Sequence, residues 1–400
     1  MRLRTFESFW LLQSGLINSY PSLQEDIACQ TLVIGGGVTG ALLSHALIAA
    51  GHDVVLIDRR DIGQGSTSAT TSMLQYEIDT QLIDLAGMIG EDNAALCYRA
   101  GIEAIEILGR LIKDEQIDCG FEWKQSLYLP HDQESLAKLQ RELTCRDRHK
   151  LGVEWLDSSS IAQCYGIAAR GGILSEKAAS VDAYRLAHGL IAKNRQRGLQ
   201  VFDQTELSHY EADDSGVRFT ASGGHTVQAR QVVFCSGFET LSLFKKKYAR
   251  IVSTFACISE PDIVLPPELF ETLVWDTNDP YIYLRSTEDH RLLIGGEDTK
   301  FNFGRYREGM KKRKSEKLIT KLRALIPGIN FIEDFNWAGA FGITKDGLPY
   351  IGRHPDFPHA VFVLGLGGNG ITFSVQGMDL ALKALAGEED TLLSLYRFDR

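Results

Sequence analysis

The sequence predicts an α/β fold with two domains, and three observations support this prediction. The length of 400 residues exceeds what one compact core usually holds. Residues 27–58 read as a short buried strand, a glycine turn, a helix ending at Gly51 and a second buried strand, which together form a βαβ unit. Residues 251–298 read mostly as strands, with a polar turn between "YIYLR" and "RLLIGG".

The remaining elements follow from periodicity and from helix-ending residues. Strands are expected within 199–237 and at 360–365. Helices are expected over 80–114, 132–150, 180–198, 316–328 and 372–386.

Composition narrows the class of protein. Apolar residues make up 44% and charged residues 24%, as in a soluble globular protein, and the net charge of −10 argues against a nucleic-acid partner. Seven cysteines without a C-x-x-C pair predict reduced thiols and a cytoplasmic location. No apolar run is long enough for a transmembrane segment. Because Glu7 interrupts the apolar patch near the start, we expect residues 1–26 to be an arm, packed through Phe6, Phe9 and Trp10, rather than a signal peptide.

The first glycine turn carries the complete signature of a dinucleotide site. Gly35, Gly37 and Gly40 spell G-x-G-x-x-G between a strand and a helix, and Asp58 ends the next strand. Such glycines let backbone N–H groups and the helix N-terminus approach a pyrophosphate, while the acid accepts the ribose hydroxyls. An aspartate at this position repels the 2′-phosphate of NADP, although the adjacent Arg59 and Arg60 could attract it. FAD and NAD therefore both remain candidate cofactors.

A second G-x-G-x-x-G occurs at Gly365, Gly367 and Gly370, again between a strand and a helix. No later strand supplies an acid, because the chain nearly ends after the helix. A glycine loop at a helix N-terminus still favours negative charge. This loop is therefore expected to face an anion that is not a second dinucleotide.

These segments resemble the D-amino-acid oxidase-like family of FAD-dependent oxidoreductases, which includes glycine, sarcosine and γ-glutamylputrescine oxidases. The resemblance covers nearly the whole chain from residue 27, and in length and N-terminal arm it is nearest to the γ-glutamylputrescine oxidase branch. It rests on "TLVIGGGVTGALLSHALIAAGHDVVLIDRRDIGQGST", "ARQVVFCSGFET", and "WAGAFGITKDGLPYIG" followed by "VFVLGLGGNGITFS".

The resemblance implies a split FAD-binding Rossmann-like domain of the glutathione-reductase type, with an inserted α+β antiparallel-sheet substrate domain. The expected parts are the arm 1–26, an FAD-binding domain of 27–99, 151–239 and 336–400, and a substrate domain of 100–150 and 240–335.

The resemblance also places the second glycine loop at the N1–C2=O edge of the flavin ring, where the reduced cofactor carries negative charge. The expected cofactor contacts are Gly35, Gly37, Val38, Thr39, Gly40, Asp58, Arg59, Gly65, Ser66, Thr67, Leu207, Ser236, Gly237, Gly342, Gly367, Gly368, Asn369, Gly370, Ile371 and Thr372.

One stretch departs from the family. "SMLQYEID" replaces the usual glycines after the Ser/Thr-rich loop 63–72, and its Gln75, Tyr76 and Glu77 are candidates to reach the flavin. No cysteine occurs near Gly339, where sarcosine oxidases attach their cofactor, and the Ser/Thr-rich loop has no histidine. Non-covalent FAD is therefore expected.

The substrate contacts are expected from "YIYLR". In a strand, Tyr281, Tyr283 and Arg285 share one face, and a guanidinium with two phenols suits a small carboxylated amine. The alternative is an exposed hairpin arginine paired with Glu288 or Asp289.

The resemblance implies oxidation of the C–N bond of a small amine or amino acid, by hydride transfer to flavin N5 and hydrolysis of the imine. The electron acceptor is O2 or another compound, and no metal site is expected, because the ten histidines lack metal-ligand spacing. Two other functions remain open: an NAD-dependent dehydrogenase that uses only the first glycine loop, and a flavin-binding scaffold without turnover.

Overall fold

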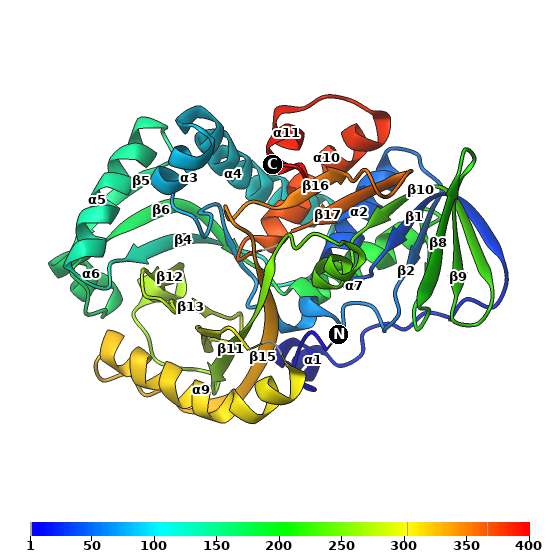
Figure 1. Cartoon of the computed structure of the whole chain (residues 1–400). Helices are drawn as coiled ribbons and strands as arrows, with labels where there is room; N and C mark the ends of the chain where they lie inside the picture. The colour runs from blue at the N-terminus through cyan, green and yellow to red at the C-terminus, as the bar shows by residue number, and fades with distance from the viewer. Residues whose placement is uncertain (1, 302, 366) are drawn as a thin grey trace.

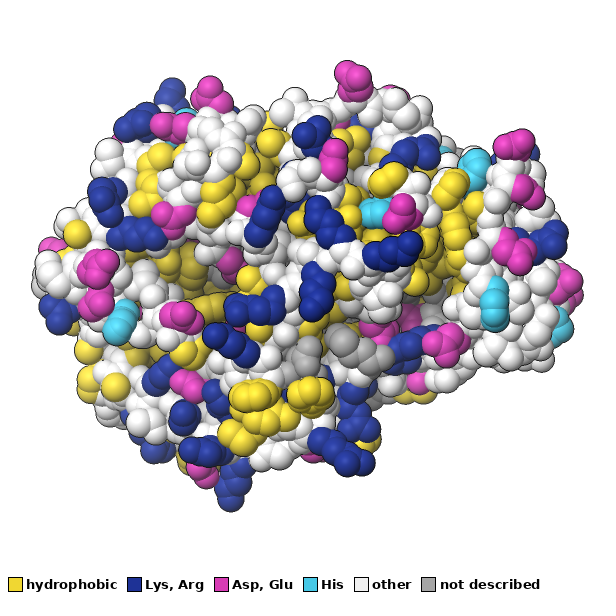
Figure 2. Space-filling view, in the orientation of Figure 1, with side chains coloured by type: hydrophobic (Ala, Val, Ile, Leu, Met, Phe, Trp, Pro, Cys, Tyr) yellow, Lys and Arg dark blue, Asp and Glu magenta, His cyan; other side chains and the backbone are white. Residues whose placement is uncertain are grey.

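The computed structural model describes residues 2–301, 303–365 and 367–400, and it contains two large β-sheets that lie side by side (Figure 1). The chain crosses between the two sheets several times, so each sheet is assembled from distant segments. No helix in the described part of the chain is long and apolar enough to cross a membrane. Figure 2 shows Lys and Arg side chains interspersed with Asp and Glu side chains over one face of the molecule.

The first sheet contains the expected βαβ unit. Its strand order is β16-β17-β10-β1-β2-β7, with β9 paired to β10 and β8 to β9. Neighbours from β17 to β7 are parallel, whereas β16 and the β8–β9 hairpin pair antiparallel. The strands are β1 (Ile27–Ile34), β2 (Val54–Ile57), β7 (Gln200–Phe202), β8 (Leu207–Asp213), β9 (Gly216–Ala221), β10 (Thr226–Phe234), β16 (Tyr350–Arg353) and β17 (Ala360–Leu364).

The second sheet is mostly antiparallel, in the order β15-β11-β14-β13-β12-β4-β6-β3, with β5 paired to β6 and one parallel pair, β12 with β4. The strands are β3 (Met73–Gln75), β4 (Glu122–Leu129), β5 (Val153–Asp157), β6 (Gly171–Ser180), β11 (Arg250–Ser259), β12 (Thr272–Asp276), β13 (Ile282–Ser286), β14 (Leu292–Thr299) and β15 (Glu333–Ile343).

This sheet differs from the expected domain boundaries. Strands β3, β5 and β6 belong to it, although we expected 27–99 and 151–239 to build the FAD-binding domain. The reason is non-local pairing, because β6 lies between β3 and β4 and its register with β4 joins residues about fifty positions apart. Strand patterns in a sequence identify a strand but not the sheet that it joins.

The helices are α1 (Phe9–Ser14), α2 (Val38–Ala49), α3 (Leu82–Ile89), α4 (Glu91–Glu115), α5 (Gln133–Arg148), α6 (Ser158–Tyr165), α7 (Ala183–Arg195), α8 (Pro267–Phe270), α9 (Gly304–Leu325), α10 (Gly370–Ala386) and α11 (Thr391–Tyr396), with 3-10 turns η1 (Ser66–Ala69) and η2 (Gly237–Leu243). Helix α9 lies along the lower edge in Figure 1, where it packs on β11, β14 and β15, whereas α10 lies near the middle and packs on both α2 and α4.

Two helices differ from their expected bounds. Gly90, at φ 88°, separates α3 from α4, because a left-handed backbone interrupts a helix and glycine adopts it readily. Helix α9 begins at Gly304 rather than near 316. The first turns of α9 are rich in Lys and Arg and lack the apolar stripe that predicts a helix. This part of α9 nevertheless packs on the protein, because Lys314 is buried and pairs with Glu297 at 3.0 Å.

The N-terminal arm packs onto the molecule as expected at two of three positions. Phe9 and Trp10 are buried, whereas Phe6 is 66% exposed. The Trp10 ring nitrogen donates to the carbonyl of Thr70 at 2.6 Å, and the Phe9 ring lies 6.1 Å from that of Trp337. The arm therefore covers η1 and β15 from outside.

Candidate active site

A cavity of about 470 Å³ lies between the two sheets and is lined by residues of both. One end is formed where β1 and β2 end, at Ile34 and Ile57. The other end is formed by Tyr281 and Tyr283 at the start of β13 and by Gly339 in β15. Ligands of open parallel sheets bind beyond the carboxyl ends of the strands, which is where the first end lies.

The first glycine loop is shaped by contacts that leave no room for side chains. Gly35 has φ 111°, and a Cβ there would lie 2.7 Å from the carbonyl oxygen of Cys235. A Cβ on Gly40 would lie 1.8 Å from the carbonyl oxygen of Gly35. A Cβ on Gly37 would lie 2.8 Å from the hydroxyl of Thr67. The glycines therefore let α2 pack closely against β1 while the loop faces the cavity.

Asp58 follows β2 and lines the same end of the cavity. Its two carboxylate oxygens accept the N–H groups of Gly36 at 2.6 Å and Arg60 at 2.8 Å. Burial raises the pKa of Asp58, and these two N–H donors partly offset that rise. The carboxylate is thereby fixed beside the glycine loop.

The two arginines after Asp58 are held by carboxylates. Arg60 pairs with Glu239 at 2.8 Å, and Arg59 pairs with Glu206 at 3.0 Å and also with Glu239. These partners neutralise the local positive charge. They therefore reduce the attraction that the arginines would offer to a 2′-phosphate.

The second glycine loop is tied to two distant segments. Gly367 donates its N–H to the carbonyl of Gly342 at 2.8 Å, at the end of β15. Gly368 donates its N–H to a carboxylate oxygen of Asp79 at 2.9 Å. Together these bonds place the loop against both the second sheet and the segment that follows β3.

Asn369 extends this connection from its place before the first turn of α10. Its side-chain amide donates to the carbonyls of Gln75 at 2.9 Å and Glu77 at 2.8 Å. The Thr372 hydroxyl in turn donates to the carbonyl of Asn369 at 2.8 Å. The segment that departs from the family pattern thus packs directly against the second glycine loop.

The three side chains singled out in that segment have different surroundings. Gln75 and Glu77 line the cavity. Tyr76 is buried away from it, and its hydroxyl lies 3.2 Å from that of Ser175. Tyr76 therefore packs within the core, while its two neighbours remain candidates for contact with a bound group.

The aromatic wall opposite this loop comes from β12 and β13. Tyr281 and Tyr283 lie with ring centroids 5.8 Å apart, and a Cβ on Gly295 would lie 2.3 Å from the Tyr283 ring. Trp275 also lines the cavity, stacked on Tyr128 at 3.6 Å. The small residue at 295 therefore makes room for Tyr283.

Arg285 does not join this wall, which corrects the expectation from strand alternation. It is 3% exposed and is not among the residues that line the cavity. Its N–H groups donate to the backbone carbonyls of Thr71, Ser72, Val181 and Ser286 at 2.9–3.1 Å, and burial lowers its pKa to about 10. The guanidinium thus stabilises the chain around β3 rather than offering a fork to a carboxylate.

The alternative of an exposed Arg285 is also wrong. Glu288 pairs with Arg185 at 3.2 Å, and Asp289 pairs with Arg291 at 2.6 Å. Strand periodicity identified the face of Arg285 but not the carbonyl oxygens that surround it.

Most of the residues expected at the cofactor lie on the cavity wall. They are Gly35, Gly37, Val38, Thr39, Asp58, Arg59, Gly65, Ser66, Thr67, Leu207, Ser236, Gly237, Gly367, Gly368, Asn369, Gly370 and Ile371. Gly40, Gly342 and Thr372 lie behind the wall and shape the two loops, as described above. Their assignment as cofactor contacts stays a prediction.

Sequence reasoning missed many residues of the wall, among them Asp79, Thr254 and Trp275. Asp79 ends the "SMLQYEID" stretch, and an acid where the family has glycines was an available signal. Thr254 and Trp275 lie in strands whose neighbours are distant in the sequence, so no local pattern marks them.

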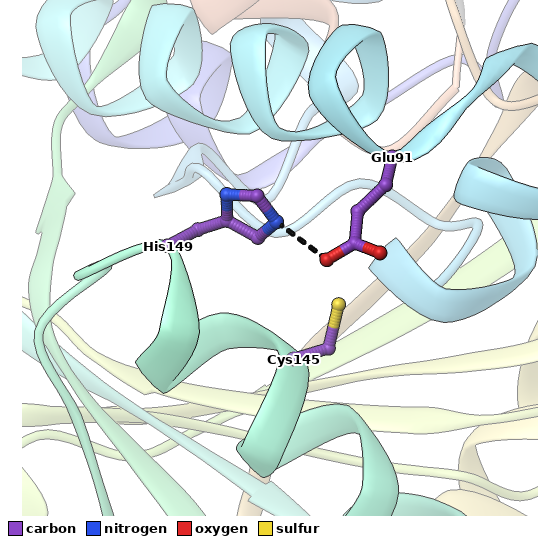
Figure 3. A group of neighbouring side chains, drawn as sticks. All are labelled: Glu91, Cys145 and His149. Carbon is purple, nitrogen blue, oxygen red and sulfur yellow. Dashed lines mark hydrogen bonds and ion pairs between the residues drawn. The ribbon is translucent and has the colours of Figure 1, made fainter.

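One group outside the cavity has the residue types of a metal site: Glu91, Cys145 and His149 (Figure 3). Their ligand atoms lie within 4.8 Å of one another. The Glu91 carboxylate, however, already accepts from His149 at 2.9 Å and from Arg148 at 2.7 Å, which makes a surface ion-pair cluster a sufficient account. We assign no metal to it.

A largely parallel sheet with a glycine loop and an acid at one end of a cavity, and a second glycine loop at the other end, is typical of a dinucleotide-dependent oxidoreductase. Comparison with known proteins specifies the family. Residues 30–381 match the family described as DAO, FAD dependent oxidoreductase, and the chain belongs to it. It is an FAD-dependent enzyme, so the alternatives of an NAD-dependent dehydrogenase and a scaffold without turnover fall away.

Relatives of similar length are glycine oxidase of Bacillus licheniformis and γ-glutamylputrescine oxidoreductase of Escherichia coli. The first is 26% identical over 355 residues, covering 85% of this chain and 88% of the relative. The second is 25% identical over 399 residues, covering 96% and 89%. A Bacillus subtilis protein whose name describes a Rieske 2Fe-2S iron–sulfur protein is 26% identical over 353 residues, and the matched part spans 66% of its length.

Solved structures confirm the fold. Glycine oxidase from Geobacillus kaustophilus superposes with a TM-score of 0.77 at 24% identity, covering 91% of this chain and 96% of that one. L-proline dehydrogenase from P. horikoshii gives a TM-score of 0.75 at 17% identity, covering 94% and 97%.

Proposed function

We propose that this enzyme oxidises the C–N bond of a small amine or amino acid. One observation carries the proposal: the second glycine loop and the tyrosine wall of β13 enclose one end of the same cavity whose other end is the Gly35–Asp58 nucleotide site. FAD, when bound, would supply the acceptor for a hydride from the carbon next to the amine nitrogen. The resulting imine is hydrolysed by water to a carbonyl compound and ammonia, or to a carbonyl compound and an amine where the substrate is a secondary amine.

The residues present fit this cofactor. Asp58 would accept the ribose hydroxyls, and the loop of Gly35 to Gly40, with the N-terminus of α2, would hold the pyrophosphate. The N-terminus of α10 would stabilise negative charge on the reduced ring, while the Gly367 and Gly368 N–H groups, which donate to Gly342 and Asp79, fix the loop.

Two observations support non-covalent FAD in a reducing compartment, which we take to be the cytoplasm. Among the described residues that line the cavity, Cys235 is the one cysteine, and it lies beside Gly35 at the nucleotide end. All seven cysteines are free, and burial raises the pKa of Cys235, which keeps it a thiol.

At the end of the cavity lined by the second glycine loop and the tyrosines, the reacting end, the side chains would orient the amine and exclude water. Tyr281, Tyr283 and Trp275 provide flat apolar surfaces with few polar atoms. Burial raises the pKa of Tyr281 well above the usual value, and the pKa of Tyr283 to about 12, so both phenols keep their protons at neutral pH. They can donate hydrogen bonds but do not act as bases.

The test is an anaerobic reduction assay on the FAD-loaded enzyme with a panel of amino acids, primary amines and secondary amines. Loss of the oxidised-flavin absorbance with at least one compound, and recovery on admission of O2 or an artificial acceptor, supports the proposal. If no amine reduces the flavin while dithionite does, the proposed reaction is wrong. The comparison of O2 with a dye identifies the class of electron acceptor.

A further inference from the structure

The two ends of the cavity differ in charge. At the nucleotide end, Arg59 and Arg60 line the wall together with acidic partners. At the reacting end, the charged side chains among the described lining residues are both acidic, Glu77 and Asp79. The Arg146 guanidinium lies 3.5 Å from Glu77 but is fully buried behind the wall, so Asp79 is the acid without a paired cation.

Asp79 is placed to meet a bound molecule. The Asp79 side chain is exposed to the cavity, and protein surrounds it on its other sides. It accepts a hydrogen bond from the Gly368 N–H, and the described part of the chain offers no lysine or arginine in an ion pair with it. A carboxylate in such surroundings gains most from a cation that the protein does not itself supply.

The residues next to Asp79 strengthen the preference of this end of the cavity for a cation. Burial raises the pKa of Tyr281, and the charges of Asp79 and Asp298 raise it further, which places Tyr281 within electrostatic reach of both acids. Asp298, on β14, has a buried oxygen without a hydrogen-bond partner. Lys314 approaches from α9 but is itself paired with Glu297 at 3.0 Å.

A carboxylate on the substrate would meet no lysine or arginine among the described residues that line this end of the cavity. Arg285, the guanidinium that strand alternation predicted for that role, donates to four backbone carbonyls instead. A substrate carboxylate would therefore face Asp79 at close range, and like charges in a partly desolvated site repel strongly. An ammonium group would be attracted by Asp79 and by the faces of Tyr281 and Tyr283.

We propose that the substrate carries a second, positively charged amino group, and that Asp79, together with the rings of Tyr281 and Tyr283, binds it. This inference rests on the proposed function. The reacting nitrogen is neutral, and its lone pair forms the new C=N bond as the carbon gives up its hydride to FAD. Water then yields the carbonyl compound and ammonia, or an amine where an internal nitrogen of a polyamine reacts, while the distal ammonium keeps its proton throughout. The substrate class is thus a diamine or a longer polyamine.

The test uses three matched probes: putrescine, butylamine and γ-aminobutyrate. They share a four-carbon amine and differ at the far end, which is cationic, apolar or anionic. Binding to the FAD-loaded enzyme is measured by titration calorimetry, and anaerobic flavin reduction is followed in parallel. We expect putrescine to bind at least about 10-fold more tightly than butylamine, and γ-aminobutyrate most weakly, because a charged hydrogen bond contributes about 1.5–3 kcal/mol, or about 10- to 150-fold.

The variant that isolates the charge is Asp79→Asn. An asparagine has the same shape and keeps an oxygen to accept the Gly368 N–H, so the loop contact survives. The variant should lose about 10-fold or more in affinity for putrescine and change little for butylamine. Asp399→Asn, which removes one exposed negative charge elsewhere, is the control and should change neither.

Two results would overturn the inference: γ-aminobutyrate or butylamine binding as tightly as putrescine, or Asp79→Asn weakening butylamine as much as putrescine. The calorimetric arm separates this outcome from failure of the proposed function. If the probes bind in the expected order but no amine reduces the flavin, the reaction is wrong and the binding site stands. If an amino acid reduces the flavin and diamines bind no better, the reaction stands and the inference is wrong.

Discussion

The two glycine loops have the same spacing, yet the structure uses them differently. In each loop an N–H donates to an aspartate, Gly36 to Asp58 at 2.6 Å and Gly368 to Asp79 at 2.9 Å. Asp58 comes from the adjacent parallel strand of the same sheet, and a second backbone N–H and nearby arginines surround it. Asp79 comes from a segment that begins in the other sheet and is open to the cavity.

The comparison teaches that the G-x-G-x-x-G spacing determines the local shape of each loop, while the segment that supplies the aspartate determines what the loop can bind. An acid delivered by the next strand is fixed within one sheet, as a nucleotide site requires. An acid delivered across the cavity joins two sheets and stays available to a ligand. Four variants test this distinction, beginning with the largest expected effect.

The change Gly40→Ala should abolish FAD binding, because its Cβ would lie 1.8 Å from the backbone carbonyl of Gly35, which cannot move without breaking the loop. The measurement is the ratio of flavin to protein absorbance after purification and after reconstitution with FAD. Gly370→Ala, with a closest approach of 2.9 Å, should lower the ratio less. Gly87→Ala, with nothing within 4 Å, is the control, and full FAD content in Gly40→Ala would contradict the packing argument.

The change Arg285→Ala tests the support of the second loop, since Arg285 holds Thr71 and Ser72 ahead of β3. Removing the donor leaves buried carbonyls unsatisfied, so we expect a loss of about 3 kcal/mol or more in unfolding free energy. Urea denaturation measures it, with Arg110→Ala on the exposed face of α4 as the control. A variant of normal stability whose KM rises only for carboxylated substrates would restore the substrate role of Arg285.

The change Asp58→Asn should show that FAD affinity depends on the acid at the nucleotide end of the cavity and not on the acid at the reacting end. It removes the charge that would hold the ribose hydroxyls, so FAD affinity should fall by about 1.5–3 kcal/mol, or about 10- to 150-fold. Asp79→Asn should leave FAD affinity within about 3-fold, a difference of about 0.7 kcal/mol. Fluorescence titration of the apoprotein with FAD measures both, and equal losses would show that the two acids act alike.

The change Asp298→Asn gives the smallest effect and depends on pH. Burial, with the charges of Asp79 and Asp279, raises the pKa of Asp298 from 3.8 to about 6, while Thr254 and Lys314 oppose the rise. Because the folded pKa is raised, the charged carboxylate destabilises the fold. The penalty is absent below pH 3.8, grows up to about pH 6 and is complete above it.

A full shift from 3.8 to about 6 corresponds to about 3 kcal/mol. The side chain is partly exposed, so screening reduces the expected gain of the variant to about 1 kcal/mol at pH 8. Urea unfolding of both proteins at pH 4 and pH 8 checks this. A gain of equal size at both pH values would exclude titration of Asp298 as its cause.

The sequence predicted the features that depend on nearby residues. The Gly35–Asp58 unit lies within one βαβ unit, so spacing and strand ends were enough to find it. The role of Arg285 could not be predicted in this way, because it depends on carbonyls of residues 71, 72 and 181. The same reason explains the placement of β5 and β6 and of the missed wall residues Thr254 and Trp275, whose partners lie in distant strands.

The central position of β10 has a consequence for biosynthesis. This strand pairs with β1 on one side and with β17 on the other, so residues near both ends of the chain flank it in the sheet. Strand β17 and the glycine loop after it are synthesised long after β1, and contacts of such long sequence separation form slowly. The cavity can therefore close only after β17 and its glycine loop have been synthesised, and FAD can stabilise the fold only from that point on.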